Sequence, residues 1–281
     1  METVCEGKRW DVLLSQCNGR IEGALPYLIG RKFGLKYILQ PQLTQFNGPW
    51  YRSDDPDLRR CVGDDLECQL RKLHAFIYIQ HFSTSIIDPA PFSPSRGYRC
   101  SQRVTYRFNP IPDPEMLPSL ADRGRKRGLE AVEKSYTLDK EVPAEEFADF
   151  HLRYWERRSG YDLIPQELLL RVVQTSLDRH QGLLYGLRDS SGRLMAARFV
   201  VFDDHCAYAL LSALQPDALR NSMTRLVWTL MADLYNRTEI YDFEGSMDPG
   251  IAHFYRSFGT TATPFYEVTR FRPRLLSHFI S

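Results

Sequence analysis

The sequence predicts an α+β protein, an α/β sandwich of two domains in which mixed, mainly antiparallel sheets are flanked by helices. Three observations support this prediction. The chain of 281 residues is long for one compact domain and comfortable for two. Segments that alternate apolar and polar residues, as half-buried strands do, are interspersed with segments of helical periodicity. The segment Asn109-Pro110-Ile111-Pro112-Asp113-Pro114 has three prolines in five positions, so we expect a boundary there, with domains at 1–112 and 113–281.

The composition excludes several classes of protein. With 43% hydrophobic and 25% charged residues, the chain resembles an ordinary globular protein and not a disordered or coiled-coil one. Its formal net charge of +1 provides no overall attraction to nucleic acid or to an anionic membrane, so any contact with a polyanion must be made by a local patch. The apolar runs are shorter than the ~20 residues of a membrane helix, and the first residues contain no apolar signal segment. We therefore expect no membrane span and a cytoplasmic protein.

The first domain is expected to begin with a hairpin. Asn18-Gly19 is a dipeptide favoured in type I′ turns because both residues tolerate positive φ, and strand-like segments flank it. Apolar runs and turn signals then predict the remaining elements. In order, we expect strands at Val12–Gln16, Arg20–Leu28 and Leu35–Leu39, a helix at 54–73, and strands at 74–82 and Gln102–Phe108.

The second domain is expected to follow the order β-α-α-β-β-β-α-β-α-β after an initial basic helix at 115–134. Its clearest helix has apolar residues at spacings of three and four, and this stripe is expected to pack on a sheet. The stripe consists of Leu219, Met223, Leu226, Val227, Leu230, Met231 and Leu234. The other expected helices run from Pro143 to about Arg158, from Pro165, and from Pro249 to Phe258; the expected strands are Tyr136–Asp139, Gly182–Leu187, Arg193–Phe202, Cys206–Leu214, Glu239–Phe243 and Ala262–Arg270.

One Cys/His series, Cys61, Cys68, His74 and His81, has to be considered as a metal site. In a helix at 54–73 the two thiols lie on one face but ~10 Å apart along the axis, too far to share an ion. The two histidines flank a strand at an odd spacing, which directs their side chains to opposite faces. We therefore predict no metal.

The order of elements in the second half is that of the GNAT acyltransferase fold, and local sequence strengthens the similarity. Asp242-Phe243-Glu244-Gly245-Ser246-Met247, followed by the segment from Gly250 to Gly259, resembles the strand-to-helix segment of GNAT and Fem-type acyltransferases. The basic segment from Leu120 to Lys134 resembles the helix that begins the second GNAT-like domain of Fem-type enzymes. The resemblance implies tandem GNAT-like domains, of which the first is a degenerate copy.

Acyl transfer to an amine needs a base and an acid, and the sequence offers a candidate for each. Glu244, just past the end of a buried strand, is a candidate general base, and Tyr255 matches the tyrosine that often serves as general acid in the GNAT enzymes that the sequence resembles. Asp242, two residues before Glu244 on the same strand, is expected to point to the same face and is a third candidate. Each has a structural alternative: a helix cap for Glu244, core packing for Tyr255, and a salt bridge to arginine for Asp242.

The resemblance also implies a donor, acetyl-CoA or another acyl-CoA, held by the backbone near Leu211 and Ser212. GNAT enzymes hold the pyrophosphate with a glycine-containing loop at a helix N-terminus, but the corresponding stretch here, 215–225, contains no glycine. The helix N-terminus still favours an anion. The side chains expected to add contacts are those of Arg220, Asn221, Ser222 and Arg225.

Three functions remain open from the sequence. The leading one is a GNAT-type N-acyltransferase that acts on an amine of a small molecule or peptide. The second is a Fem-like aminoacyltransferase that takes aminoacyl-tRNA as donor and a peptidoglycan precursor as acceptor; the missing glycines favour it, and the near-neutral charge disfavours it. The third is a catalytically silent binding protein of the same fold. The acceptor, the acyl group and the oligomeric state are not predicted.

Overall fold

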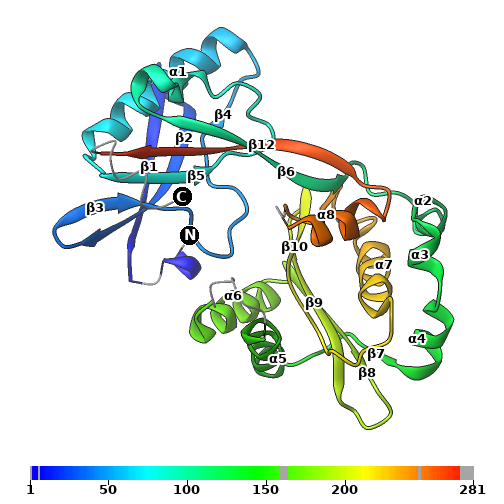
Figure 1. Cartoon of the computed structure of the whole chain (residues 1–281). Helices are drawn as coiled ribbons and strands as arrows, with labels where there is room; N and C mark the ends of the chain where they lie inside the picture. Colours follow the sequence, from blue (N-terminus) through cyan, green and yellow to red (C-terminus); the bar gives the residue numbers. More distant parts are fainter. Residues whose placement is uncertain (1, 6, 158–163, 246–247, 273–281) are drawn as a thin grey trace. The chain divides into compact units, whose positions relative to one another are not determined.

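The computed structural model describes residues 1–281 apart from 1, 6, 158–163, 246–247 and 273–281. The chain forms two compact units. The first contains the described residues of 1–103 and 264–272, and the second contains those of 104–263. The chain passes from the first unit to the second within one strand, ahead of the predicted boundary at 112–113, and returns within another. In Figure 1 the colour sequence from blue to red shows that the last described strand belongs with the first ones.

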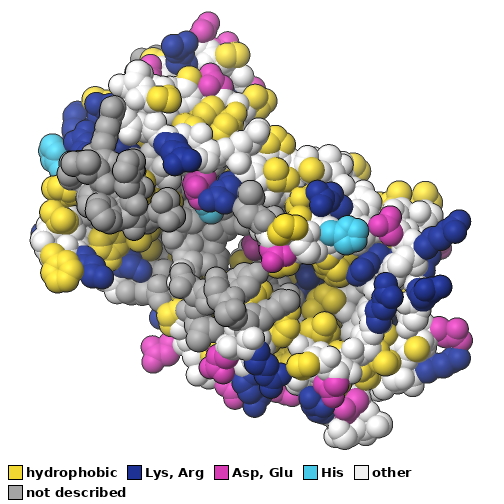
Figure 2. All heavy atoms as spheres, in the orientation of Figure 1, with side chains coloured by type: hydrophobic (Ala, Val, Ile, Leu, Met, Phe, Trp, Pro, Cys, Tyr) yellow, Lys and Arg dark blue, Asp and Glu magenta, His cyan; other side chains and the backbone are white. Residues whose placement is uncertain are grey.

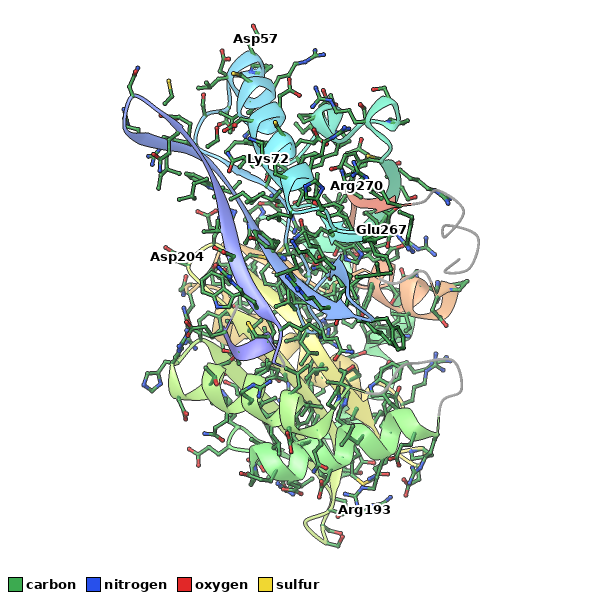
Figure 3. All side chains as sticks on the ribbon, turned by 90° about the vertical axis from the view of Figure 1, so that its left-hand side faces the viewer. Asp57, Lys72, Arg193, Asp204, Glu267 and Arg270 are labelled. Carbon is green, nitrogen blue, oxygen red and sulfur yellow. The ribbon has the colours of Figure 1, made fainter. Side chains whose placement is uncertain are left out.

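The first unit is a sheet with the strand order β1-β2-β3-β5-β12-β6, and β4 pairs with β2. Helix α1 packs against β1 and β2, and its two ends are marked by Asp57 and Lys72 in Figure 3. The elements are β1 Arg9–Cys17, β2 Arg20–Lys32, β3 Leu35–Ile38, β4 Trp50–Tyr51, α1 Pro56–Lys72, β5 Ile77–His81, β6 Arg99–Phe108 and β12 Thr261–Phe271, with short 3-10 helices at Glu2–Val4, Ala90–Phe92 and Pro94–Arg96.

The local sequence accounts for these elements. Asn18 and Gly19 adopt φ of 50° and 76° and join Cys17 to Arg20, so the expected hairpin and its turn are present. Asp55 caps α1 by accepting a hydrogen bond from the Leu58 N–H, and Pro56 occupies the first helical position. The core of the unit lies between α1 and the sheet and contains Leu25, Ile38, Leu66, Leu70, Tyr78, Phe82, Phe92 and Val268.

One carboxylate joins three strands of the first unit. Glu267 on β12, labelled in Figure 3, accepts two hydrogen bonds from Arg103 at 2.9 and 3.0 Å and lies 3.3 Å from Nε2 of His81. These strands are β12, β6 and β5. Hydrogen bonding to His81 and Arg103 lowers the pKa of Glu267 to about 2, so its charge persists throughout the usual pH range.

The second unit is a sheet with the order β6-β11-β10-β9-β8-β7. Figure 1 shows α5 and α6 on one face of this sheet and α7 on the other. The elements are α2 Leu117–Leu120, α3 Arg123–Lys126, α4 Leu129–Ser135, β7 Thr137–Asp139, α5 Ala144–Glu156, α6 Gln166–Asp178, β8 Gly182–Arg188, β9 Leu194–Phe202, β10 Cys206–Leu214, α7 Ser222–Leu234, β11 Ile240–Asp242 and α8 Pro249–Arg256.

Side chains along β9 alternate between the two helical layers. Phe199 contacts Phe147 of α5, with ring centroids 6.4 Å apart, whereas Ala196 and Val200 belong to the core under α7. The apolar stripe of α7 is buried as expected from Leu226 to Leu234, although Leu219 lies before the helix begins. Arg198, which lies between Ala196 and Val200 in the alternation, therefore faces α7.

The expected basic helix at 115–134 is wrong as a single element, because the structure divides it into three short helices. Ala121 adopts an extended conformation at the end of α2, and Arg127 does so at the end of α3. Gly128 then adopts a left-handed φ of 86°, which glycine tolerates and which interrupts any helix. Within the described residues, no helix is long and apolar enough to cross a membrane.

Candidate active site

Strands β10 and β11 pair over a short length and then separate. Their parallel ladder contains three residue pairs, from Cys206↔Ile240 to Tyr208↔Asp242. Beyond it, β10 continues to Leu214 while β11 ends at Asp242. Leu211 and Ser212, the residues expected to hold the donor, lie in this continuation and keep their pairing to β9 alone. Their backbone groups on the β11 side are therefore outside the β10–β11 ladder.

A β-bulge lies at the same place. The register between β10 and β9 shifts between Tyr208 and Leu211, so three residue steps on β10 correspond to two on β9. A bulge takes a residue out of the regular ladder and changes the direction of the strand. The bulge and the end of the β11 ladder coincide, so β10 leaves the regular ladder on both sides at one point of the sheet.

Asp242, the last residue of β11, is a fully buried carboxylate whose oxygens are occupied. Oδ2 accepts from Nε of Arg107 at 2.6 Å, and Oδ1 accepts from the Thr105 hydroxyl and, at 2.7 Å, from the Glu244 N–H. Burial raises its pKa, against the opposing effect of Arg107. The ion pair to arginine that was the structural alternative for Asp242 is thus present. Because Asp242 also accepts from the Glu244 N–H, it orients the backbone of Glu244, the next candidate.

Glu244 lies beyond the end of β11. Its φ of 64° is left-handed, so side chains no longer alternate between the two sheet faces there. The expectation that Asp242 and Glu244 share a strand face is therefore wrong, because the left-handed residue redirects the second side chain. The capping alternative also fails: Asp248, not Glu244, accepts from Gly250 and Ile251 at the start of α8. Oε1 of Glu244 is buried with no hydrogen-bond partner among the described residues.

The environment of Glu244 favours its neutral form. Burial, and then the carboxylate of Asp242, raise the pKa of Glu244 well above the ordinary glutamate value of 4.5, and Arg198 partly opposes the change. A buried acceptor without a partner is costly for folding. Such a group in a protein interior is a candidate for a functional role.

Arg198 is the residue that sequence reasoning missed. It lies on β9 with only 2% of its surface exposed, and Nε and Nη2 have no hydrogen-bond partner among the described residues. Its guanidinium lies over the ring of Phe243, with Cζ 5.8 Å from the centroid. Burial lowers its pKa, but Tyr241, Tyr255 and Glu244 together outweigh that effect. The available signal was one cation inside the apolar run Leu194–Phe202, since an arginine in a buried strand is rarely there for packing alone.

Tyr255 lies on α8, near the same guanidinium. Its ring packs against Phe243 and Tyr106, with centroids 5.3 and 5.9 Å apart, so the core-packing alternative describes part of its environment. Burial raises the pKa of its hydroxyl to about 12, although Arg198 opposes the shift. The hydroxyl therefore retains its proton at neutral pH. Arg198, Glu244 and Tyr255 form one cluster, together with the buried Tyr241 hydroxyl.

The predicted phosphate contacts at the start of α7 are mostly committed to other parts of the protein. Nδ2 of Asn221 donates to the carbonyls of Gly124 and Arg127 at 2.7 and 2.8 Å and so holds the α3–α4 segment. The Ser222 hydroxyl donates to the Leu219 carbonyl at 2.6 Å, and Arg225 forms an ion pair with Glu133 at 3.0 Å. These three side chains stabilise the loop that lacks glycine.

Arg220 has a different environment. It lies beside α3, with Nη2 3.8 Å from the position of a Cβ on Gly124. Burial and the charge of Arg220 lower the pKa of Arg125, whose Nε is buried without a partner among the described residues. The Arg125 guanidinium also lies over the Phe254 ring, 4.9 Å from its centroid. An anion between Arg125 and Arg220 would relieve their repulsion.

Among the residues that the structure describes, no group of three or more His, Cys, Asp or Glu side chains is arranged to hold a metal ion. This applies also to the series from Cys61 to His81.

Comparisons with known proteins define the class of this site. Residues 121–250 match the acetyltransferase (GNAT) domain family, a span that includes Arg198, Asp242 and Glu244. No curated protein matches the sequence. The match places a GNAT-type acetyltransferase domain within residues 121–250, where the sheet and its separated strands lie.

Solved structures add the arrangement of the whole chain. FemX is similar with a TM-score of 0.67 at 12% identity, over 98% of this chain and 90% of that one. L-PGS from Bacillus licheniformis is similar with a TM-score of 0.59 at 12% identity, over 97% and 86%. A tandem GNAT protein from the clavulanic acid biosynthesis pathway reaches 0.56 at 12% identity, over 94% and 83%. Over most of its length the chain thus has the fold of these proteins.

Proposed function

We propose that the second unit transfers an acyl group from an acyl-CoA, in the first instance acetyl-CoA, to the amine of a small molecule or peptide. The observation that carries the proposal is the cluster of Arg198, Glu244 and Tyr255, in which buried donors and a buried acceptor have no partner among the described residues. Acyl transfer to an amine requires such groups: a base for the ammonium, donors for the carbonyl oxygen and an acid for the leaving group.

Glu244 acts as the base in this proposal. Its carboxylate accepts a proton from the substrate ammonium, and the neutral amine then attacks the carbonyl carbon of the thioester. Burial supports the assignment, because a glutamate with a raised pKa is a stronger base than an exposed one. The contact from the Glu244 N–H to Asp242 fixes the backbone that orients it.

Arg198 stabilises the oxyanion that forms when the amine attacks. Its unpartnered Nε and Nη2 donors are held in a fixed direction by the strand, so they need no reorganisation during the reaction. Tyr255 then donates its proton to the sulfur of coenzyme A as the C–S bond breaks and the C–N bond is complete. The amine nitrogen still carries an extra proton after the attack, and this proton passes to solvent as the amide forms. The proton that Glu244 accepted returns the tyrosine to its neutral form through solvent, so the reaction releases one proton overall.

Tyr255→Phe tests the role of general acid. We expect the variant to fold and to bind the donor like the wild type, because its ring still packs on Phe243, while the transfer rate falls about a hundredfold. Calorimetric titration with coenzyme A gives the binding, and release of free thiol from acetyl-CoA in the presence of an amine gives the rate. Wild-type turnover in the variant would remove Tyr255 from the reaction.

The donor is tested by titration with coenzyme A. Arg125, Arg220 and the N-terminus of α7 are the proposed phosphate contacts, so Arg220→Gln should weaken binding about tenfold if they hold the pyrophosphate. Arg193→Gln is a matched control, since Arg193 is half-exposed and pairs with Asp217 in a turn. No heat and no thermal shift at saturating coenzyme A would contradict an acyl-CoA donor.

An aminoacyl-tRNA donor is the second candidate, and one observation favours it. Asn221, Ser222 and Arg225 are engaged within the protein, so the loop offers fewer phosphate contacts than the sequence suggested. An aminoacyl ester presents the same carbonyl to Arg198 and Glu244 as a thioester does. A filter-binding assay separates the donors, because tRNA binding is expected to weaken steeply with added salt and coenzyme A binding only slightly.

A further inference from the structure

The turn between β2 and β3 contains a residue that the backbone does not favour. Lys32 pairs with Leu35, and the two residues between them, Phe33 and Gly34, have φ of 51° and 79°. This is type I′ geometry, whose first position favours asparagine, aspartate or glycine. The turn between β1 and β2 has nearly the same φ values and uses Asn18 and Gly19. The fold therefore does not explain a phenylalanine at position 33.

Phe33 is also 92% exposed, so it gains almost nothing from burial. One further large apolar residue of this hairpin is partly exposed: Leu35, two residues along the chain, at 44%. The Lys32 ammonium lies over the Phe33 ring, 5.8 Å from its centroid. An exposed apolar tip surrounded by cations is a feature of binding surfaces.

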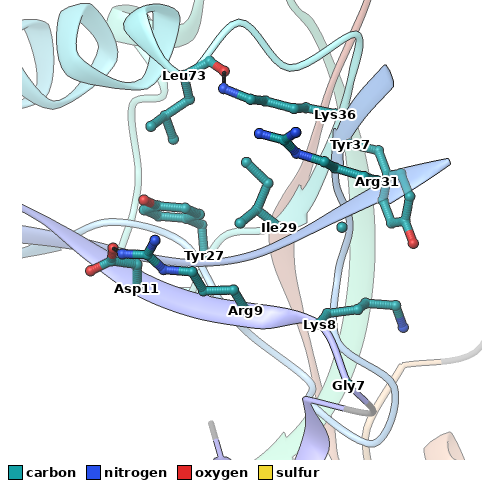
Figure 4. A pocket seen from close by; sticks show the side chains of 11 residues that line it. Gly7, Lys8, Arg9, Asp11, Tyr27, Ile29, Arg31, Lys36, Tyr37 and Leu73 are labelled. Carbon is teal, nitrogen blue, oxygen red and sulfur yellow. Dashed lines mark hydrogen bonds and ion pairs between the residues drawn. The ribbon is translucent and has the colours of Figure 1, made fainter. Parts of the chain in front are cut away.

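A basic pocket of about 700 Å³ lies beside this turn (Figure 4). Lys8, Arg9, Arg31 and Lys36 contribute to its lining, against one acidic residue, Asp11. Arg9 pairs with Asp11 at 2.9 Å, and Lys36 donates to the Leu73 carbonyl at 3.1 Å. Figure 4 shows the Arg31 and Lys36 side chains extending toward Leu73 on the same side of the pocket. Asp11 is engaged by Arg9, so it is not the counterion of Arg31 or Lys36.

The floor of the pocket is apolar. Tyr27, which is buried, and Ile29 line it from β2. The Tyr37 ring packs directly on Gly30, where a Cβ would lie 2.3 Å from the ring. Only glycine at that position leaves room for the ring. In Figure 2 hydrophobic and basic side chains lie next to one another over the β3 end of the first unit. The pocket thus offers cations at its rim and a ring and aliphatic surface below.

We propose that the β2–β3 turn docks on the surface of an anionic phospholipid membrane. Phe33 and Leu35 enter the interface between headgroups and acyl chains, and the pocket receives a headgroup phosphate between Arg31 and Lys36. The whole chain has a net charge of only +1, so the attraction is local to this surface. A soluble phosphate compound would account for the pocket, but it would leave Phe33 and Leu35 without a function.

Phe33→Asn is the sharpest test, because it gives this turn the residue that the β1–β2 turn has. We expect the thermal unfolding temperature to stay the same or rise, since asparagine tolerates the left-handed conformation better. Affinity for vesicles of phosphatidylserine and phosphatidylcholine should fall about tenfold. Ile87→Asn is the matched control: Ile87 is 82% exposed in the connection after β5, and its replacement should leave vesicle binding unchanged.

The charges are tested in the same flotation assay with the full chain. Arg31→Gln and Lys36→Gln should each weaken binding about fivefold at low ionic strength, whereas Arg20→Gln, at the opposite end of β2, should not. Equal binding to pure phosphatidylcholine vesicles would overturn the proposal. So would heat of binding to inorganic phosphate or glycerol phosphate without any vesicle binding, which would indicate a soluble ligand, or loss of binding in Ile87→Asn equal to that in Phe33→Asn.

Discussion

Replacing Arg198 by glutamine is expected to lower the rate of acyl transfer by two to three orders of magnitude, about the effect of removing an oxyanion donor. The side chain is buried on β9 with Nε and Nη2 unpartnered, so its loss removes donors that no neighbouring residue replaces. The measurement is the transfer rate at saturating donor and acceptor, together with thermal unfolding to establish that the variant is folded. Wild-type kcat/KM in a folded Arg198→Gln variant would contradict the role.

Two further variants control this experiment. Arg198→Lys keeps the positive charge but lacks the planar guanidinium with its several N–H donors. We therefore expect its transfer rate to lie between those of Arg198→Gln and the wild type. Arg237→Gln removes a guanidinium that lies 4.3 Å from the Phe202 ring centroid, away from the cluster, and should leave the rate unchanged. If Arg198→Gln does not fold, the comparison of Arg198→Lys with Arg237→Gln still tests the assignment.

Glu244→Gln is expected to slow transfer at neutral pH about a hundredfold or more, and to change the pH profile. In the wild type the carboxylate form of Glu244 is the active base, and burial raises its pKa well above 4.5. Activity should therefore fall as the pH decreases through the raised pKa. The variant has no such group and should lose this acid limb. Glu239→Gln, which removes an exposed acid just before β11, should retain the wild-type profile.

The raised pKa of Glu244 also predicts how the free energy of unfolding depends on pH. A carboxyl whose pKa is raised in the folded state binds its proton more tightly there than in the unfolded chain. Its contribution to stability is complete below the unfolded value of 4.5 and is lost as the pH rises through the folded pKa. Glu244→Gln should therefore gain unfolding free energy relative to the wild type as the pH rises, measured by urea denaturation at acidic and neutral pH. A constant difference across that range would contradict the raised pKa.

Much of the fold follows from short-range signals. Asn18-Gly19 predicted its turn, and the apolar stripe of α7 predicted both the helix and its buried face, because each depends on neighbouring residues alone. The segment 115–134 was different. It contains many helix-favouring residues but no continuous apolar stripe that would hold them in one helix. The left-handed conformation of Gly128, which separates α3 from α4, was not predicted from the sequence.

The candidate site was predicted by residue type and only in part by arrangement. Glu244 and Tyr255 are in one cluster as expected, but the left-handed backbone at Glu244, which separates it from the face of Asp242, depends on contacts from β6. Arg198 was hidden in an apolar run because its neighbours in the fold, Tyr241, Phe243 and Tyr255, come from much later in the chain. The sequence therefore shows a cation within an apolar run but not the partners that surround it.

The position of β12 between β5 and β6 has a consequence for biosynthesis. A ribosome delivers the strands of the first unit early, then the whole second unit, and only afterwards the strand that fills the gap. Until then β5 has an open edge with Ile77 and Ile79, which invites pairing with other chains. Domains usually fold in the order of their synthesis. Here the unit that starts first is completed last, so the edge of β5 stays unpaired until the second unit has been synthesised.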